Sequence, residues 1–192
     1  MTFVYDRTAY DVERLKELKQ TAYEDMTASE KAEYNASKGA YNYTDLNRVE
    51  GDVADIAPTF AGASAELLAY AMNLGITLDK TTNVPFDADA FADLTTKTDW
   101  DAEDVPTKAD LTRYINNALL VAKAIPVAVS GSLPDGINKL TYEGANALER
   151  YMEAVWNAYP GTMTEAKAKM DRSAAWTTSG ALNCGQLNCG MI

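Results

Sequence analysis

Residues 144–159 read Gly-Ala-Asn-Ala-Leu-Glu-Arg-Tyr-Met-Glu-Ala-Val-Trp-Asn-Ala-Tyr, and this stretch decides the fold class. Its apolar side chains recur every three or four residues, at Ala145, Leu148, Met152, Val155, Trp156 and Tyr159. That period places them on one wide face of an α-helix, which other elements must cover. Pro160 and Gly161 follow directly, so we expect the helix to end there.

The helical pattern recurs on both sides of this stretch. Periodicity and stop signals predict helices over residues 9–23, 28–37, 45–57, 63–74, 111–125 and 163–172, with Pro58, Gly75 and Pro126 as stop signals. Thr-x-x-acid capping signatures occur at Thr8–Asp11, Thr27–Glu30, Thr107–Asp110 and Thr162–Glu165, and Thr44 is a further candidate cap. The sequence therefore predicts a mainly α fold, an irregular helical bundle that forms one body over residues 1–174.

A long irregular connection interrupts this body at about residues 76–106. It contains Pro85, an acidic stretch over 87–93 and Trp100. A connection of this size is uncommon inside a compact domain. We expect a short helix or hairpin around 88–94 and expect Trp100 to hold the connection against the body.

The last segment, residues 175–192, differs in character from the rest. The five-residue unit x-Leu-Asn-Cys-Gly occurs twice in tandem, over 181–185 and 186–190. Repeated glycines disfavour helix, so the segment predicts turns and short strands, a docking tail for another subunit or another copy. Its assembly residues would be Trp176, Leu182, Cys184, Leu187 and Cys189. For the two cysteines, small buried apolar residues are the first interpretation, ahead of disulfides between copies and of a metal or redox site.

Composition excludes several classes of function. The net charge is −11 and there is no histidine. The first property opposes nucleic-acid binding, and the second removes the commonest general base and metal ligand. Two cysteines five residues apart cannot form a structural zinc site. We expect no enzyme, no cofactor, no metal, no membrane insertion and, since residues 1–7 lack a signal-peptide pattern, synthesis in the host cytoplasm.

A recurring polar pattern provides the candidate site. Asn47 and Glu50 on one predicted helix match Asn146 and Glu149 on another, and Arg113 lies on the helix between them in sequence. Residues three apart share a helical face, so we expect these five to form one partly buried network. The network would be a hydrogen-bonded clamp in which Arg113 neutralises both acids. The alternative is a pair of catalytic or metal-binding carboxylates.

Five motifs in a fixed order resemble a family of uncharacterised prophage and phage proteins of Gram-positive bacteria, associated with tails or baseplates. The motifs are Tyr5-Asp6-Arg7-Thr8, residues 43–50, residues 104–107 with 113–116, residues 140–142 with 146–149, and the Ser-Gly/Cys-Gly ending. The resemblance covers most of the chain and is weakest over residues 58–98. Residues 58–75 do not follow the family pattern, and we interpret them as an insertion. It implies a virion structural protein with other tail or baseplate proteins as partners, and no catalytic residues.

Three functional hypotheses follow. The first is a virion component of the phage tail, baseplate or fibre. It would assemble as a homo-oligomer through its C-terminal segment, residues 175–192, and its helical surface. The second is an adhesin module that binds a host surface glycan or receptor through residues 41–43 and 76–106. Its sugar-binding surface would use the tyrosines at positions 41, 43, 114, 142 and 151. The alternative interpretation is that these tyrosines pack in the core. The third is a cell-wall hydrolase with Glu50 and Glu149 as its acids.

Overall fold

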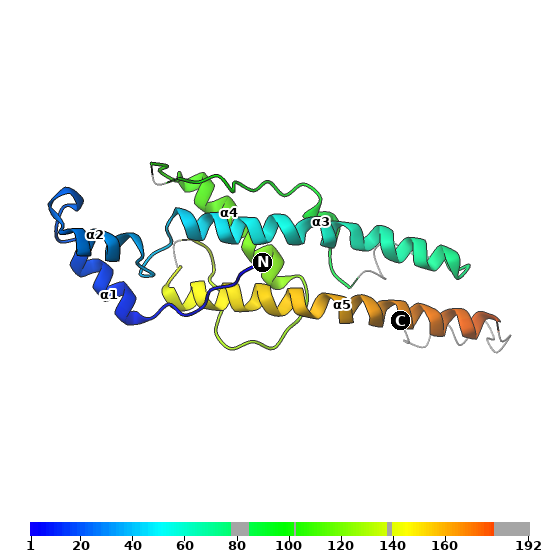
Figure 1. Ribbon diagram of the computed structural model, residues 1–192. Coiled ribbons are helices and arrows are strands. Elements are labelled where there is room, and N and C mark those ends of the chain that lie inside the picture. The colour runs from blue at the N-terminus through cyan, green and yellow to red at the C-terminus, as the bar shows by residue number, and fades with distance from the viewer. Residues whose placement is uncertain (78–84, 102, 138–139, 179–192) are drawn as a thin grey trace. The chain divides into compact units, whose positions relative to one another are not determined.

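The structure is a computed structural model that describes residues 1–77, 85–101, 103–137 and 140–178. These ranges contain helices and connections and no strand, so the predicted mainly helical class is confirmed. The helices are α1 (Ala9–Leu18), α2 (Ala28–Asn35), α3 (Tyr43–Asn73), α4 (Lys108–Lys123) and α5 (Tyr142–Thr178), with 3-10 helices η1 (Tyr23–Asp25) and η2 (Asp89–Phe91) (Figure 1).

The chain divides into two compact units, where the sequence predicts one body. Unit 1 comprises Met1–Ala57 and Leu94–Asn157, and unit 2 comprises Pro58–Asp93 and Ala158–Ile192. α3 and α5 each contribute their first part to unit 1 and their last part to unit 2. Two of the three boundaries therefore fall within helices, where no change in composition marks them, and the third falls between Asp93 and Leu94 in the irregular connection.

α3 continues through Pro58, where the sequence predicts an end and then a separate helix. A proline inside a helix costs about 3 kcal/mol, because it removes a hydrogen bond and its ring crowds the preceding turn. The apolar stripe stays in register across it, and its members are buried: Leu46, Val49, Val53, Ile56, Phe60, Ala63, Leu67 and Ala71. Pro58 itself is exposed. Burial of the stripe on both sides outweighs the local cost.

The two ends of α3 are set by different signals. Asn42, and not the predicted Thr44, caps the start, since its side-chain oxygen accepts the backbone N–H groups of Thr44 at 2.9 Å and Asp45 at 3.1 Å. At the other end Gly75 has φ +69°, and the N–H of Ile76 donates to the carbonyl of Ala71 at 3.0 Å. This is a Schellman motif, and Gly75 terminates the helix as predicted.

α5 likewise continues through Pro160 and Gly161, so the predicted end there and the separate helix over 163–172 are wrong. The predicted cap Thr162 lies inside the helix, where its hydroxyl donates to the carbonyl of Ala158 at 3.0 Å. Buried side chains continue on both sides of the proline, at Met152, Val155, Tyr159, Met163 and Met170. α5 also includes residues 175–178 of the predicted tail. The other predicted β/turn positions, 179–192, lie outside the described residues.

Three of the four predicted capping boxes are present, at Thr8, Thr27 and Thr107. In each, the threonine hydroxyl accepts a backbone N–H of the first turn, and the acid three residues on accepts the N–H of the threonine. α1 ends at Leu18, earlier than predicted, and η1 leads into α2. α2 has no buried residue, which confirms its predicted place on the surface.

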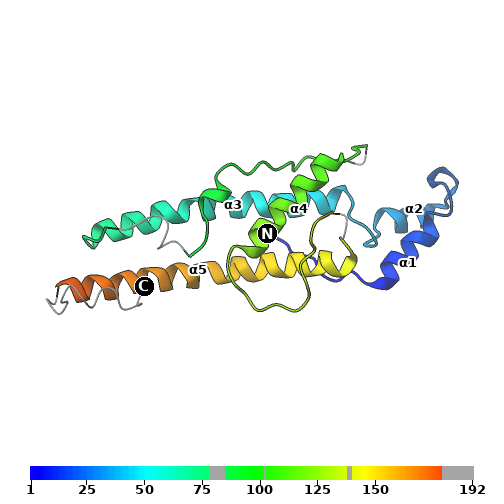
Figure 2. The same ribbon diagram turned by 180° about the vertical axis from the view of Figure 1, so that it is seen from behind.

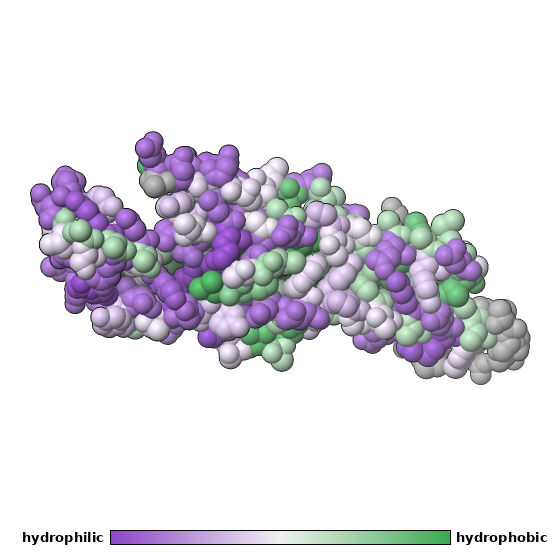
Figure 3. All heavy atoms as spheres, in the orientation of Figure 1, coloured by the Kyte–Doolittle hydropathy of each residue, from purple (hydrophilic) through white to green (hydrophobic). Residues whose placement is uncertain are grey.

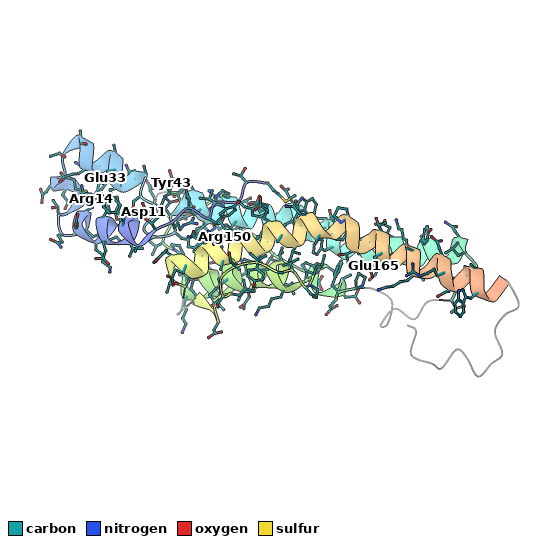
Figure 4. The ribbon with its side chains drawn as sticks, turned by 90° about the horizontal axis from the view of Figure 1, so that it is seen from below. Asp11, Arg14, Glu33, Tyr43, Arg150 and Glu165 are labelled. Atoms are coloured by element: carbon teal, nitrogen blue, oxygen red, sulfur yellow. The ribbon has the colours of Figure 1, made fainter. Side chains whose placement is uncertain are left out.

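α1 and α2 form a helical hairpin within unit 1 (Figures 1 and 2). Arg14 of α1 makes a two-pronged ion pair with Glu33 of α2, with N–O distances of 2.6 and 2.7 Å (Figure 4). Gly39, just after the hairpin, lies so close to Asp11 and Leu15 that a Cβ atom would collide with both. The outer surface of the hairpin carries mainly hydrophilic residues (Figure 3).

Unit 2 is built around an aromatic cluster. Phe60 of α3 stacks on Tyr159 of α5, with ring centroids 4.7 Å apart. The ring centroids of Phe86 and Phe91, both in the connection, lie 4.9 and 5.1 Å from that of Phe60. Such ring pairs contribute about 0.5–1.5 kcal/mol each beyond the area they bury. In the described part of the connection the only regular element is η2, shorter than the helix expected over 88–94.

Within the described ranges, no helix is long and apolar enough to cross a membrane.

Candidate functional site

Glu149 of α5 is the centre of a buried ionic cluster in unit 1. Its side chain has no exposed surface. Its Oε1 accepts from Arg7 Nη1 and from Arg48 Nη2, each at 3.0 Å, and its Oε2 pairs with Arg48 Nη1. The backbone N–H of Val4 donates to the same Oε2 at 2.6 Å. Both carboxylate oxygens are therefore occupied by charged or backbone donors.

Asp45 completes the cluster from the first turn of α3. Its Oδ1 accepts from Arg7 Nη2 at 2.7 Å and from Arg48 Nη2 at 2.8 Å. Two carboxylates thus face two guanidinium groups, so the cluster is neutral. Burial by itself disfavours the charge of Arg7, but Asp45 and Glu149 nevertheless hold its pKa above the ordinary value. Pairing of this kind offsets part of the cost of taking charges out of water, and removal of one partner would leave the other charge buried without compensation.

The cluster fastens the N-terminal segment, residues 1–7, between α3 and α5 (Figure 1). The N–H of Thr2 donates to Asp52 at 3.2 Å, and the carbonyl of Thr2 accepts from Arg48 at 3.2 Å. Arg7 donates to the carbonyl of Val4 at 2.9 Å. Asn146 binds both backbone groups of Arg7, accepting its N–H at 3.2 Å and donating to its carbonyl at 2.7 Å. Side chains here satisfy an extended backbone that has no partner strand.

A second buried group holds the connection that follows residue 94. Glu50 of α3 is completely buried, pairs with Arg113 Nη2 at 2.8 Å and accepts the backbone N–H of Lys97. Asn47, one turn earlier, bonds both the N–H and the carbonyl of Trp100, each at 2.8 Å. Trp100 is buried, as predicted.

The five predicted clamp residues therefore fall into two groups. Asn47, Glu50 and Arg113 form one, and Asn146 and Glu149 belong to the other. The predicted ion pair between Arg113 and Glu50 is present, but Arg113 does not neutralise both acids: its second partner is Asp110 at 3.1 Å. Glu149 uses Arg7 and Arg48 instead.

Arg7, Arg48 and Asp45 were not among the predicted site residues, although a signal for one of them exists. A buried carboxylate on an apolar helical face requires a cation nearby. Arg48 lies within the Asn47–Glu50 motif, and Arg7 lies in the short polar stretch ahead of the first predicted helix. The need for a cation beside each acid indicates Arg48 through its place in the motif, but it does not single out Arg7 among the 17 Lys and Arg of the chain.

The contacts of Glu50 and Glu149 are those of residues that stabilise the fold. Each carboxylate is inaccessible to solvent and holds guanidinium and backbone N–H donors. A general acid or base needs a proton path to substrate, and a metal ligand needs free lone pairs. The described residues contain no group of three or more His, Cys, Asp or Glu that could hold a metal ion.

The predicted tyrosine set is dispersed. Tyr114 is in the core and packs edge-on against the half-buried Tyr41, with ring centroids 5.6 Å apart. The guanidinium of Arg7 lies 4.6 Å from the centroid of Tyr41. Tyr151 donates to the carbonyl of Val129 at 3.2 Å, while Tyr43 is exposed. Tyr41 thus contacts the ionic cluster through Arg7, and Tyr114 packs against Tyr41.

Trp176, predicted to anchor the tail, lies on the last turns of α5 and is 49 % exposed. The other predicted assembly residues, Leu182, Cys184, Leu187 and Cys189, lie outside the described residues.

Asp52, one turn after Arg48 on α3, has a strongly shifted titration. Burial raises the pKa of Asp52 to about 6, against an ordinary value of 3.8, and its Oδ2 is buried without a hydrogen bond to the described residues. As the pH rises from 3.8 to 6, the unfolded chain ionises first. The folded state therefore loses stability over that interval, and the penalty is complete at higher pH.

We expect Asp52→Asn to raise the free energy of unfolding by about 1–3 kcal/mol at neutral pH. The gain should shrink as the pH falls from 6 and disappear below 3.8, where Asp52 is protonated in both the folded and the unfolded chain. Urea denaturation across this range measures it. Asp55→Asn, on the exposed side of α3, is the matched control and should change little. A gain in the control equal to that of Asp52→Asn would contradict the assignment.

No family model matches this chain, and no similar curated protein or solved structure is found. The resemblance to phage and prophage proteins therefore stays a prediction from the five motifs.

Proposed function

We propose that this chain is a non-catalytic structural subunit of a phage particle, in its tail, baseplate or fibre. The observation that carries the structural role is the state of Glu149, which is fully buried and held by Arg7, Arg48 and Val4. Its contacts fasten parts of the chain together and leave no oxygen for a substrate. The order of the five motifs supports the phage assignment.

We propose further that residues 179–192 are the segment that joins this subunit to a neighbour or to another copy. From Thr177 to Ile192 the sequence carries no charged side chain, in a chain with 45 Asp, Glu, Lys and Arg (17 + 28). An uncharged segment with two leucines and two cysteines gains free energy by burial in an interface. It follows directly from α5, a helix of 37 residues.

The test is a chain that ends at Thr178, expressed in place of the full chain during particle production. We expect it to keep the helical circular dichroism signal of the full chain but to be absent from purified particles. Cutting at this point leaves α5 intact, whereas a deletion from residue 175 would remove its last turn. Loss of the helical signal, or normal incorporation of the shortened chain, would contradict the docking role.

Two matched variants separate the contributions within the segment. Leu182→Ser with Leu187→Ser removes apolar surface and should reduce incorporation. Cys184→Ser with Cys189→Ser keeps nearly the same size and should be tolerated, and its failure would indicate disulfides between copies.

Immunogold labelling of intact particles locates the subunit. Gold at a fixed site such as the tail tip is the expected result. Unlabelled particles beside abundant free protein would overturn the proposal, and glycan-array binding that persists without residues 179–192 would then favour the adhesin.

A further inference from the structure

We propose that the side chains of α3 and α5 that hold residues 1–7 in unit 1, together called the groove below, are a binding site for an extended peptide. This site accepts residues 1–7 of a second copy of the chain as well as its own. The inference does not depend on whether the chain belongs to a particle. It concerns a part of the molecule remote in sequence from residues 179–192.

The groove recognises its occupant mainly through the peptide backbone. Asp52 and Glu149 accept the N–H groups of residues 2 and 4, which are two apart and so point the same way in an extended chain. Arg48 and Arg150 donate to the carbonyls of residues 2 and 5, at 3.2 and 3.3 Å. The amide of Asn146 binds both backbone groups of residue 7. Side chains of two helices here replace the neighbouring strand of a sheet.

Only one side chain of the segment is bound as specifically as its backbone. The guanidinium of Arg7 is 3 % exposed and reaches Asp45 and Glu149. Met1, Thr2, Tyr5 and Asp6 are exposed, and Phe3 and Val4 are half-buried. The site therefore requires an extended backbone with an arginine at its seventh position, and it is permissive toward most of the other side chains.

An empty groove would be costly. Without the segment, Glu149 loses its bonds from Arg7 and Val4, and Asn146 loses both of its bonds. Buried polar groups left without partners cost free energy, so the groove favours being filled. The same seven residues from a second copy satisfy every one of these groups equally, and exchange of an identical element between copies is a low-cost route to a dimer.

The chain has a suitable pivot directly after the segment. Thr8 has extended backbone angles, φ −127° and ψ 164°, and is the N-cap of α1. α1 and α2 keep their own contacts through Arg14 and Glu33. Residues 1–7 can therefore leave the groove by rotation at Thr8 without unfolding the hairpin, at the expense of the exposed ion pair between Asp6 and Lys38.

The test uses the synthetic peptide Met-Thr-Phe-Val-Tyr-Asp-Arg-amide with a fluorophore on its N-terminus, where Met1 is exposed. The receptor is the full-length Arg7→Ala chain, whose own segment has lost its anchor. Fluorescence anisotropy should show saturable binding of one peptide per chain. The peptide with Arg7→Ala should bind at least about tenfold more weakly. The peptide with Asp6→Asn is the matched control and should bind nearly like the parent, because the ion pair of Asp6 with Lys38 is exposed and contributes little.

The wild-type chain supplies the second measurement and does not depend on the folding of a variant. Native mass spectrometry at rising protein concentration should show a dimer. Excess parent peptide should convert that dimer to peptide-bound monomer, while the Arg7→Ala peptide should not. The proposal is overturned if a folded receptor binds both peptides equally or neither, if the wild-type chain stays monomeric and takes up no peptide, or if the dimer persists in excess parent peptide.

Discussion

Replacing Glu149 with glutamine is expected to lower the free energy of unfolding by about 3–5 kcal/mol. The substitution keeps the size of the side chain but removes the charge that faces Arg7 and Arg48. Asp45 would then be the remaining carboxylate for the buried guanidinium of Arg7 and the half-buried guanidinium of Arg48. Glutamine would also present N–H donors where the arginines require an acceptor. Urea denaturation followed by circular dichroism measures the loss.

Glu165→Gln is the matched control for this experiment. Glu165 lies on the same helix, α5, and its partner Lys169 is 3.2 Å away, but both side chains are mostly exposed (Figure 4). Exposed pairs contribute little, so we expect a change below about 1 kcal/mol. Equal effects of the two substitutions would show that Glu149 is not held as described. Normal stability combined with loss of an enzymatic activity in both Glu50→Gln and Glu149→Gln would instead support the hydrolase hypothesis.

Replacing Phe60 with alanine is expected to destabilise unit 2 by about 3–5 kcal/mol. Phe60 is completely buried and contacts Phe86, Phe91 and Tyr159. The substitution leaves a cavity at the centre of this cluster and removes three ring pairs at once. Unit 2 is the smaller unit, and Phe60 lies at the centre of its described aromatic side chains, so they cannot easily fill the space it leaves. Loss of helical signal at lower urea concentration measures the effect.

Tyr10→Ala is the control for Phe60→Ala, because it also removes an aromatic ring from a helix. Tyr10 is 74 % exposed on α1, so its loss should change the free energy of unfolding by about 0.5 kcal/mol or less. If Phe60→Ala were equally mild, the aromatic cluster would not be the core of unit 2.

Local signals in the sequence were sufficient for three of the helix starts, those of α1, α2 and α4. The capping boxes at Thr8, Thr27 and Thr107 form as predicted, because the hydroxyl, the acid and the backbone N–H groups they bind lie within one turn. The stop signals at Pro58 and Pro160 failed for a non-local reason. Burial on both sides of each proline keeps the helix continuous, and that burial depends on packing partners far away in the sequence.

The candidate site was predictable in part: the sequence indicates four of its polar residues on α3 and α5, but not Arg7, Arg48 and Asp45 and not the pairing. Asn47 and Glu50, and Asn146 and Glu149, are buried or half-buried polar groups on apolar helical faces, as their spacing indicates. Helical periodicity specifies the face of a residue and not the segment that covers it. The N-terminal segment that brings Arg7 to Glu149 is extended and has no period, so nothing local in its sequence indicates that it lies between two helices.

Amide hydrogen exchange of residues 1–7 tests most directly whether the ionic cluster around Glu149 holds this segment. Terminal residues usually exchange at the rate of an unfolded chain, because nothing holds their N–H groups. We predict that the N–H groups of Val4 and Arg7, bound by Glu149 and Asn146, exchange much more slowly than that in the wild-type chain, and that Glu149→Gln abolishes the protection of Val4. Exchange of the Val4 and Arg7 N–H groups at the unfolded rate in the wild-type chain would contradict the claim that the ionic cluster holds the N-terminal segment.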